Sequence, residues 1–439
     1  MTSNKRQESS IEKNLPEGMR FYLPPQSEVM TDLARRGSQA LKEWGYRPIY
    51  VPALIPYDTI VGGLGGESVK DCYKLVDYRG EILVLRPEMT AAIAEKLACE
   101  NDREDLYGRY QYFAPVYRHE STQSGKKREI YQLGAEFLGE SRYADIEILL
   151  LAQEILLSCG VSDFKVEIGH VGYFDQLISE FGLSQQEEAG LKSSLASRNL
   201  VQYRNLCQSL TDDIGERLLR LLDLRGDIEI LQRAENLLSS STSRPLDQLR
   251  EIYSGLKDIG YAERISFDLG LTRDLNYYSG LVFEIMSPQL GYNICGGGRY
   301  DRLLEKMGGK RVAARGFALG IERLRLIREK QNPDGSGDDK ASIYFASSEL
   351  MQPAVQLARR LHEQNLTTRL KNEAIIDDIQ IESSQEISIV VKDGENDGEN
   401  SIVYDLRIKD RLETELKETE VIKIAAEYAE SSSAQGQII

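Results

Sequence analysis

Two pairs of strand-like segments, each joined by a short polar stretch, place the strongest constraint on the fold of this chain. The first pair is 73–77 and 82–86, and the second is 109–118 and 129–139, with the polar loop 121–127 between them. Consecutive strands connected in this way pair antiparallel. The sequence therefore predicts an antiparallel sheet in the first third of the chain.

Helical segments and further strands are expected around these hairpins. Apolar residues at helical spacing predict helices at 27–44, 88–97 and 144–158, and the stretch 317–324 is expected to begin another. Additional strands are expected at 50–55, 164–170, 265–269 and 282–286. Residues 184–256 are predominantly helical and polar, which indicates an inserted helical subdomain. The predicted fold class is therefore α+β.

A change in composition divides the chain after residue 330. Residues 331–341 begin with a polar stretch rich in turn residues, so we expect a linker between a core at 1–330 and a C-terminal domain at 342–439. The pattern beyond the linker predicts a small α/β domain, and residues 431–437 are expected to be disordered. The expected strands and helices of this domain are 343–346, 354–364, 387–391, 401–405 and 414–429.

The charge of the chain argues against a broad nucleic-acid surface. The formal net charge is -16, and residues 331–439 hold 22 acidic against 11 basic side chains. Protein surfaces that bind nucleic acids neutralise phosphates with Lys and Arg, although an acidic protein can still bind RNA through a local basic patch. The C-terminal domain is therefore a poor candidate for an RNA clamp.

Histidine and cysteine usage predicts neither a metal site nor a cofactor. The three histidines, His119, His170 and His362, stand far apart, and the five cysteines form no CxxC pair. Cysteines without a disulfide framework suit a reducing compartment, and residues 1–16 are charged and polar, unlike a signal sequence. No apolar run approaches the roughly 20 residues of a membrane-spanning helix. We expect a cytoplasmic protein.

The second hairpin carries polar residues that suit a zwitterionic ligand. Gln132, Gly134 and Glu136 alternate along the return strand and line one surface, and Arg118 reaches over it from the end of the first strand. A guanidinium group suits carboxylate or phosphate oxygens, and a carboxylate suits an ammonium or imidazole N–H. A solvated hairpin held by surface ion pairs is the alternative interpretation of this motif alone.

Two further motifs have structural explanations when taken singly. Glu88 follows Pro87 in the expected first turn of a helix, where a carboxylate compensates the helix dipole. The glycine cluster 296–298, followed by Arg299 and Asp301, permits either close approach of a ligand or a tight bend in a sheet. The cluster does not match the GxGxxG pattern of dinucleotide-binding loops.

Taken together and in this order, the three motifs resemble the class II aminoacyl-tRNA synthetase core, and specifically the histidyl-tRNA synthetase family, over most of residues 15–325. The resemblance implies an antiparallel sheet flanked by helices. It places Arg118 at the motif 2 arginine, which contacts the α-phosphate of ATP, Arg323 at the motif 3 arginine, and Arg273 at the catalytic arginine. The positions that grip histidine in this family correspond to Glu88, Thr90, Gln132, Glu136, Tyr277 and Tyr278.

Differences from the usual histidyl-tRNA synthetase sequence argue against catalysis by this chain. This chain reads Arg-Asp-Leu-Asn-Tyr-Tyr at 273–278, where synthetases typically read Arg-Gly-Leu-Asp-Tyr-Tyr. Asn276 removes a negative charge, and Asp274 adds one beside the arginine, which should weaken its attraction for phosphates. Met89 replaces a usual Gly, and Lys126 stands about where the motif 2 loop has an Arg, so a bidentate grip is lost. We expect a compromised ATP site and a largely retained histidine site.

A paralogous family, the regulatory subunit of the short-form ATP phosphoribosyltransferase, resembles this chain more closely. The resemblance rests on 15–18, on 77–90 and above all on 168–174, whose Gly-His-Val-Gly block the synthetases do not usually carry. It implies a non-catalytic subunit of the enzyme that performs the first step of histidine biosynthesis. A separate catalytic subunit would transfer the phosphoribosyl group from PRPP to ATP, and this chain would help transmit feedback by histidine. It also implies a homodimer within a hetero-oligomer, without tRNA.

On this hypothesis the synthetase pocket survives as a relic. Its expected histidine-binding positions are Glu88, Met89, Thr90, Arg118, Gln132, Glu136, Arg273, Tyr277 and Tyr278, and its nucleotide-contact positions are Arg118, Lys126 and Arg323. An active histidyl-tRNA synthetase is the alternative. The C-terminal domain favours it by its length, although the domain resembles a degenerate anticodon-binding domain. A stand-alone histidine sensor that acts on some other protein is the third hypothesis.

Overall fold

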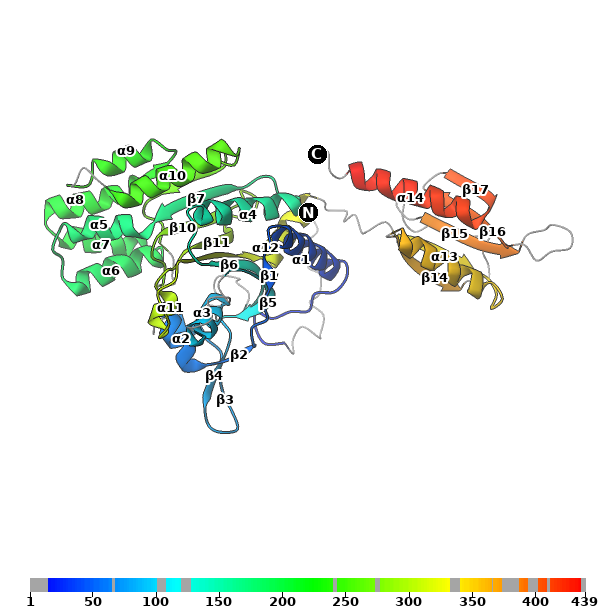
Figure 1. Ribbon diagram of the computed structural model, residues 1–439, viewed down its shortest axis with the longest axis horizontal. Coiled ribbons are helices and arrows are strands. Elements are labelled where there is room, and N and C mark those ends of the chain that lie inside the picture. Colours follow the sequence, from blue (N-terminus) through cyan, green and yellow to red (C-terminus); the bar gives the residue numbers. More distant parts are fainter. Residues whose placement is uncertain are drawn as a thin grey trace, which may run out of the picture. The chain divides into compact units, whose positions relative to one another are not determined.

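The described residues of the computed structural model build a nine-stranded sheet in the first part of the chain (Figure 1). The structure describes residues 15–64, 68–100, 108–119, 128–239, 243–272, 277–331, 340–364, 366–372, 387–393, 402–408 and 411–435. In spatial order the strands are β1 (Arg47–Pro48), β5 (Arg109–Tyr117), β6 (Glu129–Leu138), β12 (Ala314–Gly320), β11 (Asn293–Arg299), β10 (Leu281–Met286), β7 (Lys165–His170), β9 (Ile265–Asp268) and β8 (Arg225–Gly226).

Most neighbouring strands of this sheet run antiparallel. Among the described residues, the pairs β1–β5 and β7–β9 are parallel, and the other pairs, from β5–β6 to β8–β9, are antiparallel. The hairpin of β5 and β6 was predicted from the sequence, and its register places Tyr112 opposite Gly134 and Tyr110 opposite Glu136. The predicted α+β fold class with an antiparallel sheet is confirmed.

Helices cover both faces of the sheet, as the alternation of its residues requires. One face is covered by α1 (Gln26–Glu43), α4 (Ala144–Ser158) and α12 (Ile321–Gln331). The other is covered by α2 (Tyr57–Leu64), α3 (Thr90–Cys99), α11 (Leu303–Lys306), the short η2 (Ser68–Asp71) and a small sheet of β2 (Leu54–Pro56), β4 (Ile82–Leu85) and β3 (Lys74–Val76). Leu133, Ala135 and Phe137 of β6 belong to the first core, and Tyr112 belongs to the second. Successive residues of a strand point to opposite faces, so each core receives alternate positions.

A helical subdomain is inserted between β7 and β9. Its elements are α5 (Val171–Ser179), α6 (Gln185–Ala196), α7 (Leu200–Ser209), α8 (Asp212–Arg220), η5 (Leu221–Asp223), α9 (Ile230–Glu235) and α10 (Arg244–Asp258). Helix α6 begins at a capping box, in which the Ser184 and Glu187 side chains satisfy each other's backbone N–H groups. Leu191, Tyr203 and Leu249 join the first core, so the insertion packs against the sheet rather than apart from it.

Three predicted segments were wrong in detail. The helix expected to begin at 317 begins at Ile321, because Phe317 and Leu319 enter the first core from strand β12. The run 50–55 is not one strand, since only its last two residues belong to β2. Glu88 precedes helix α3, which begins at Thr90, instead of lying in its first turn.

The chain separates into two compact units, Met1–Gln331 and Asn332–Ile439. The second contains a five-stranded sheet among its described residues, in the order β14 (Thr367–Asn372), β13 (Lys340–Phe345), β15 (Ile387–Asp393), β16 (Ile402–Ile408) and β17 (Arg411–Leu416). Its helices α13 (Met351–Glu363) and α14 (Glu418–Gln435) share a core with the sheet. The single element expected at 414–429 is divided between the end of β17 and α14, and α14 continues to Gln435, where disorder was expected.

None of the described helices combines the length and the apolar character that a membrane crossing requires.

Candidate functional site

The small residues of β12 and β11 form a flat surface, here called the floor, in the middle of the large sheet, on the face covered by α3. Gln132, Gly134 and Glu136 of β6 are paired with Gly320, Ala318 and Gly316 of β12, which in turn lie beside the glycines of β11. A Cβ atom on Gly316 would collide with the carboxylate of Glu136 and with the carbonyl oxygen of Ala135. The glycine therefore allows the Glu136 side chain to lie across β12.

Glu136 is a buried carboxyl group surrounded by hydroxyl groups. Its side chain is 1% exposed. The Thr90 hydroxyl donates to Oε1 at 2.7 Å, and the Tyr300 hydroxyl donates to Oε2. Burial raises the pKa of Glu136 to about 8, although the hydrogen bonds from Thr90, Tyr300 and Tyr112 act in the opposite direction. At neutral pH this carboxyl group therefore holds a proton most of the time.

Glu88 is a second buried carboxyl group, and it closes the start of helix α3. Its oxygens accept hydrogen bonds from the backbone N–H groups of Thr90 at 2.9 Å and Ala91 at 2.6 Å. The Tyr277 hydroxyl lies 3.5 Å from Oε2. Burial raises the pKa of Glu88, and the hydrogen bond from Ala91 and the charge of Arg118 oppose that rise. Thr90 bonds to both carboxyl groups and so joins them in one cluster.

The remaining predicted residues lie at different distances from this cluster. Arg118 donates from Nε to the carbonyl oxygen of Pro87 at 2.7 Å, beside Glu88. Met89 is buried between Glu88 and Thr90. The Arg323 side chain lies against Gly320, at 3.3 Å from the position that a Cβ atom would take there. Gly320 is paired with Gln132, so Arg323 lies at the other end of the floor. The predicted positions Lys126 and Arg273 lie outside the described residues, as do Asp274 and Asn276.

Aromatic rings form the wall of the cluster. The Tyr277 ring lies 4.9 Å from that of Tyr278 and 5.6 Å from that of Tyr300, centroid to centroid. Tyr112 fills the space above Gly134. Tyr112 and Tyr300 were missed by the sequence analysis. Tyr300 directly follows the glycine motif and Arg299, and Tyr112 faces Gly134 across the predicted hairpin, so both had a sequence signal.

Chemically, the cluster suits a ligand that carries N–H groups. Two carboxyl groups and several hydroxyl groups offer hydrogen-bond acceptors in a dry environment, and the tyrosines offer ring faces to a flat or cationic group. No group of three or more His, Cys, Asp or Glu among the described residues is arranged to hold a metal ion.

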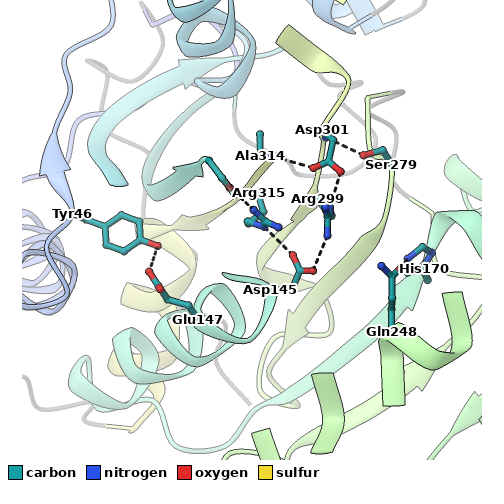
Figure 2. A network of polar contacts seen from close by, with 11 residues as sticks. Tyr46, Asp145, Glu147, His170, Gln248, Ser279, Arg299, Asp301, Ala314 and Arg315 are labelled. Carbon is teal, nitrogen blue, oxygen red and sulfur yellow. Dashed lines mark hydrogen bonds and ion pairs between the residues drawn. The ribbon is translucent and has the colours of Figure 1, made fainter. Parts of the chain in front are cut away.

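The block around His170 has a structural role. His170 ends β7 and caps α5, since its Nδ1 accepts a hydrogen bond from the backbone N–H of Gly172 at 3.1 Å. Its Nε2 lies 2.8 Å from Oε1 of Gln248 on α10 (Figure 2). A Cβ on Gly169 would collide with the carbonyl oxygen of Asp268. The block therefore fixes the turn from the sheet into the helical insertion.

Comparison with known proteins shows the family to which this chain belongs. A family model for histidyl-tRNA synthetase matches residues 18–324. An ATP phosphoribosyltransferase regulatory subunit from Halothermothrix orenii is 39% identical over 355 residues, which cover 80% of this chain and 85% of that protein. The protein of the same description from Moorella thermoacetica is 34% identical over 370 residues, or 83% and 94% of the two chains. The chain belongs to the ATP phosphoribosyltransferase regulatory subunit family.

Solved structures agree with this family. A crystal structure from Bacillus halodurans, described as an ATP phosphoribosyltransferase regulatory subunit/histidyl-tRNA synthetase, matches with a TM-score of 0.72 and 32% identity over 86% of this chain and 97% of that one. A histidyl-tRNA synthetase from a Nostoc species matches with a TM-score of 0.77 over 94% and 99% of the two chains, but at 17% identity it shows the fold alone. The resemblance predicted from the motifs is confirmed, and the regulatory subunit family is favoured over the synthetase alternative.

Proposed function

We propose that this member of the regulatory subunit family assembles with a separate short-form ATP phosphoribosyltransferase catalytic subunit and binds L-histidine at the cluster around Glu88 and Glu136. The observation that carries the proposal is the pair of buried carboxyl groups joined by Thr90 within one aromatic-lined cluster. Buried acidic groups are retained where they meet a ligand or a partner group, because burial without one is costly.

The groups of histidine match those of the cluster. Its ammonium and imidazole N–H groups suit the two glutamates, and its carboxylate suits the guanidinium of Arg118, which is held beside Glu88 by the carbonyl oxygen of Pro87. Tyr277 and Tyr278 offer ring faces to the imidazole. The amide of Gln132, on the same face of β6 as Glu136, supplies a further hydrogen-bonding group.

In the proposed complex, the catalytic subunit carries out the phosphoribosyl transfer and this chain does not. Support comes from the altered residues Asp274 and Asn276, from Met89 at the start of α3, and from the names of the relatives. The acidic C-terminal unit argues against tRNA as a partner. We place a homodimer of this chain within a cytoplasmic hetero-oligomer.

A reconstitution experiment tests this function. The purified chain, mixed with a short-form catalytic subunit, should restore phosphoribosyl transfer from PRPP to ATP, and histidine should inhibit the mixture. The chain alone should show neither histidine-dependent ATP–pyrophosphate exchange nor charging of tRNA. Exchange or charging by the chain alone would favour the synthetase. Histidine binding without any effect on the transferase would favour the stand-alone sensor.

A further inference from the structure

A second cleft lies behind the large sheet, on the face opposite the Glu136 cluster. Its volume is about 760 Å³, and it opens between the loop 140–143, the start of α4, and α10. We call it the rear cleft. Most of the α10 residues that line it lie three or four positions apart and so share one face of the helix, namely Arg244, Gln248, Glu251, Gly255 and Asp258; Ile252 and Ser254 also line the cleft.

The floor of the rear cleft is a closed network of ion pairs (Figure 2). Asp145, in the first turn of α4, accepts from Nε of Arg315 at 3.0 Å and from Nη1 of Arg299 at 3.3 Å. Arg299 also donates from Nε to Asp301 at 2.7 Å. Two arginines and two aspartates balance in charge, and Arg315 is only 2% exposed. The floor is therefore neutral and firmly held.

The ion-pair network is connected to the Glu136 cluster because residues of the two groups are neighbours in the sequence. Asp301 follows Tyr300, whose hydroxyl bonds to Glu136, and Arg315 precedes Gly316, over which the Glu136 carboxylate lies. Arg315 and Gly316 are neighbours in β12 and so point to opposite faces of the sheet, whereas Tyr300 and Asp301 directly follow the end of β11. A shift of Arg299 or Asp301 behind the sheet therefore moves groups that hold Glu136 in front of it.

The rim of the rear cleft is charged with both signs. Arg244, Glu251 and Asp258 are exposed, and none of their side chains makes an ion pair or hydrogen bond with a residue in the described part of the chain. Arg244 opens helix α10 and Asp258 closes it, which separates them by roughly 21 Å along the axis. Glu140 and Arg142, in the loop before α4, also line the cleft, so charges of both signs are spread along its rim.

A polypeptide segment fits this pattern better than a small ion does. A single small ion could pair with charges of only one sign on this rim. An extended segment of about six residues spans roughly 20 Å and can present an acidic side chain to one end and a basic one to the other. Charge complementarity of this kind selects and orients protein partners.

We propose that the rear cleft docks a segment of the catalytic subunit, and that docking acts on the Glu136 cluster through Arg299 and Asp301. The inference rests on the proposed function, because it names the surface by which the regulatory subunit meets its partner. A regulatory subunit needs its ligand site and its partner site to be coupled in free energy. The shared strands β11 and β12 provide the physical connection between the two sites.

Charge reversal on α10 tests the docking step. The association of the full chain with the catalytic subunit is measured by analytical ultracentrifugation and calorimetry. We expect Arg244→Glu and Glu251→Lys each to raise the Kd at least ~10-fold. The control Lys257→Glu changes an exposed residue of the same helix that does not line the cleft, and it should change the Kd less than about twofold.

The outcomes separate this inference from the proposed function. If wild-type chain and catalytic subunit do not associate at all, the proposed function fails. A second outcome is that the wild-type chain associates with the catalytic subunit, and that the variants Arg244→Glu and Glu251→Lys bind it as tightly as Lys257→Glu does. In that case the proposed function stands, and the rear cleft is not the docking surface.

A second experiment tests the connection through the sheet. The histidine Kd of the chain is measured with and without saturating catalytic subunit, and we expect the two values to differ at least about fivefold for the wild type. Asp145→Asn should bring their ratio close to one, and Arg299→Lys, which keeps the charge, should retain part of it. If circular dichroism shows Asp145→Asn to be unfolded, Asp301→Asn replaces it. A wild-type ratio of one, or an unchanged ratio in the variant, overturns the connection.

Discussion

The carboxyl group of Glu136 is enclosed by Thr90, Tyr300 and strand β12, so its ligand interactions are shielded from water. We predict that Glu136→Ala weakens histidine binding by about 1.5–3 kcal/mol, because the N–H groups of the ligand lose a buried hydrogen-bonding partner in a dry pocket. Calorimetry measures the effect. Glu188→Ala, at a partly exposed position of α6, is the control and should leave the affinity unchanged. Equal affinities in both variants would remove this pocket from the proposed function.

The protonation of Glu136 also makes stability depend on pH. Burial raises its pKa from 4.5 to about 8 in the folded protein, whereas the unfolded chain releases this proton near 4.5. Between these values the folded state holds one more proton, so the free energy of unfolding falls as pH rises, by at most about 1.4 kcal/mol per pH unit. The stabilising contribution is complete below pH about 4.5 and is lost as pH rises through about 8.

A comparison with Glu136→Gln isolates this contribution, because the amide does not titrate. Urea unfolding of both proteins between pH about 5 and about 8 should show the wild type losing stability relative to the variant as pH rises. A difference that stays constant over this range would mean that Glu136 is ionised throughout.

At the scale of single elements, strand β12 depends on its small residues. We predict that Gly316→Ala destabilises the protein by about 1–3 kcal/mol and abolishes histidine binding, because the added Cβ collides with the Glu136 carboxylate and with backbone. Gly62→Ala in α2 is the matched control, since nothing lies within 4 Å of its Cβ position and alanine favours a helix. Urea denaturation and calorimetry on both variants check the prediction. Intact histidine binding by Gly316→Ala would show that the ligand lies elsewhere.

The end of β7 offers a second prediction at this scale. His170→Ala removes the cap of α5 and the contact with Gln248 on α10, which should lower the free energy of unfolding by about 1–2 kcal/mol. His170→Asn restores a side-chain acceptor for the cap and should recover part of the loss. Hydrogen exchange should show the lost protection concentrated in α5. Equal stability of the alanine and asparagine variants would contradict the capping role.

Local pairing explains which elements could be predicted from the sequence. The hairpins of β3 with β4 and β5 with β6 join neighbours along the chain, so strand pattern and loop length suffice to find them. Strand β12 pairs with β6, about 180 residues earlier, and its Gly316, Ala318 and Gly320 carry no strand signal. The helix that follows at Ile321 was therefore extended backwards in the prediction.

The candidate site divides in the same way. Glu88, Thr90 and Glu136 were predicted through the motif order, and the structure joins them by hydrogen bonds. Tyr112 and Tyr300 stand beside predicted motifs, but they were missed because their contribution to the site depends on which face of a long-range sheet they occupy. No local pattern reports that face until the register of β6, β12 and β11 is known.

At the scale of the whole molecule, the proposed sites belong to one unit. The Glu136 cluster and the rear cleft both lie within Met1–Gln331, and the acidic second unit has its own sheet and core. A unit with its own hydrophobic core can in principle fold alone. The two proposed binding activities therefore should not need the second unit.

A fragment ending at residue 331 tests this division. We predict that it shows a cooperative unfolding transition by circular dichroism, binds histidine with a Kd within about twofold of that of the full chain, and still associates with the catalytic subunit, because every described residue of both sites is retained. Arg244→Glu in the fragment should weaken association as it does in the full chain. A folded fragment that binds histidine but not the catalytic subunit would transfer the docking role to the second unit. Loss of histidine binding by a folded fragment would instead show that the second unit completes the pocket.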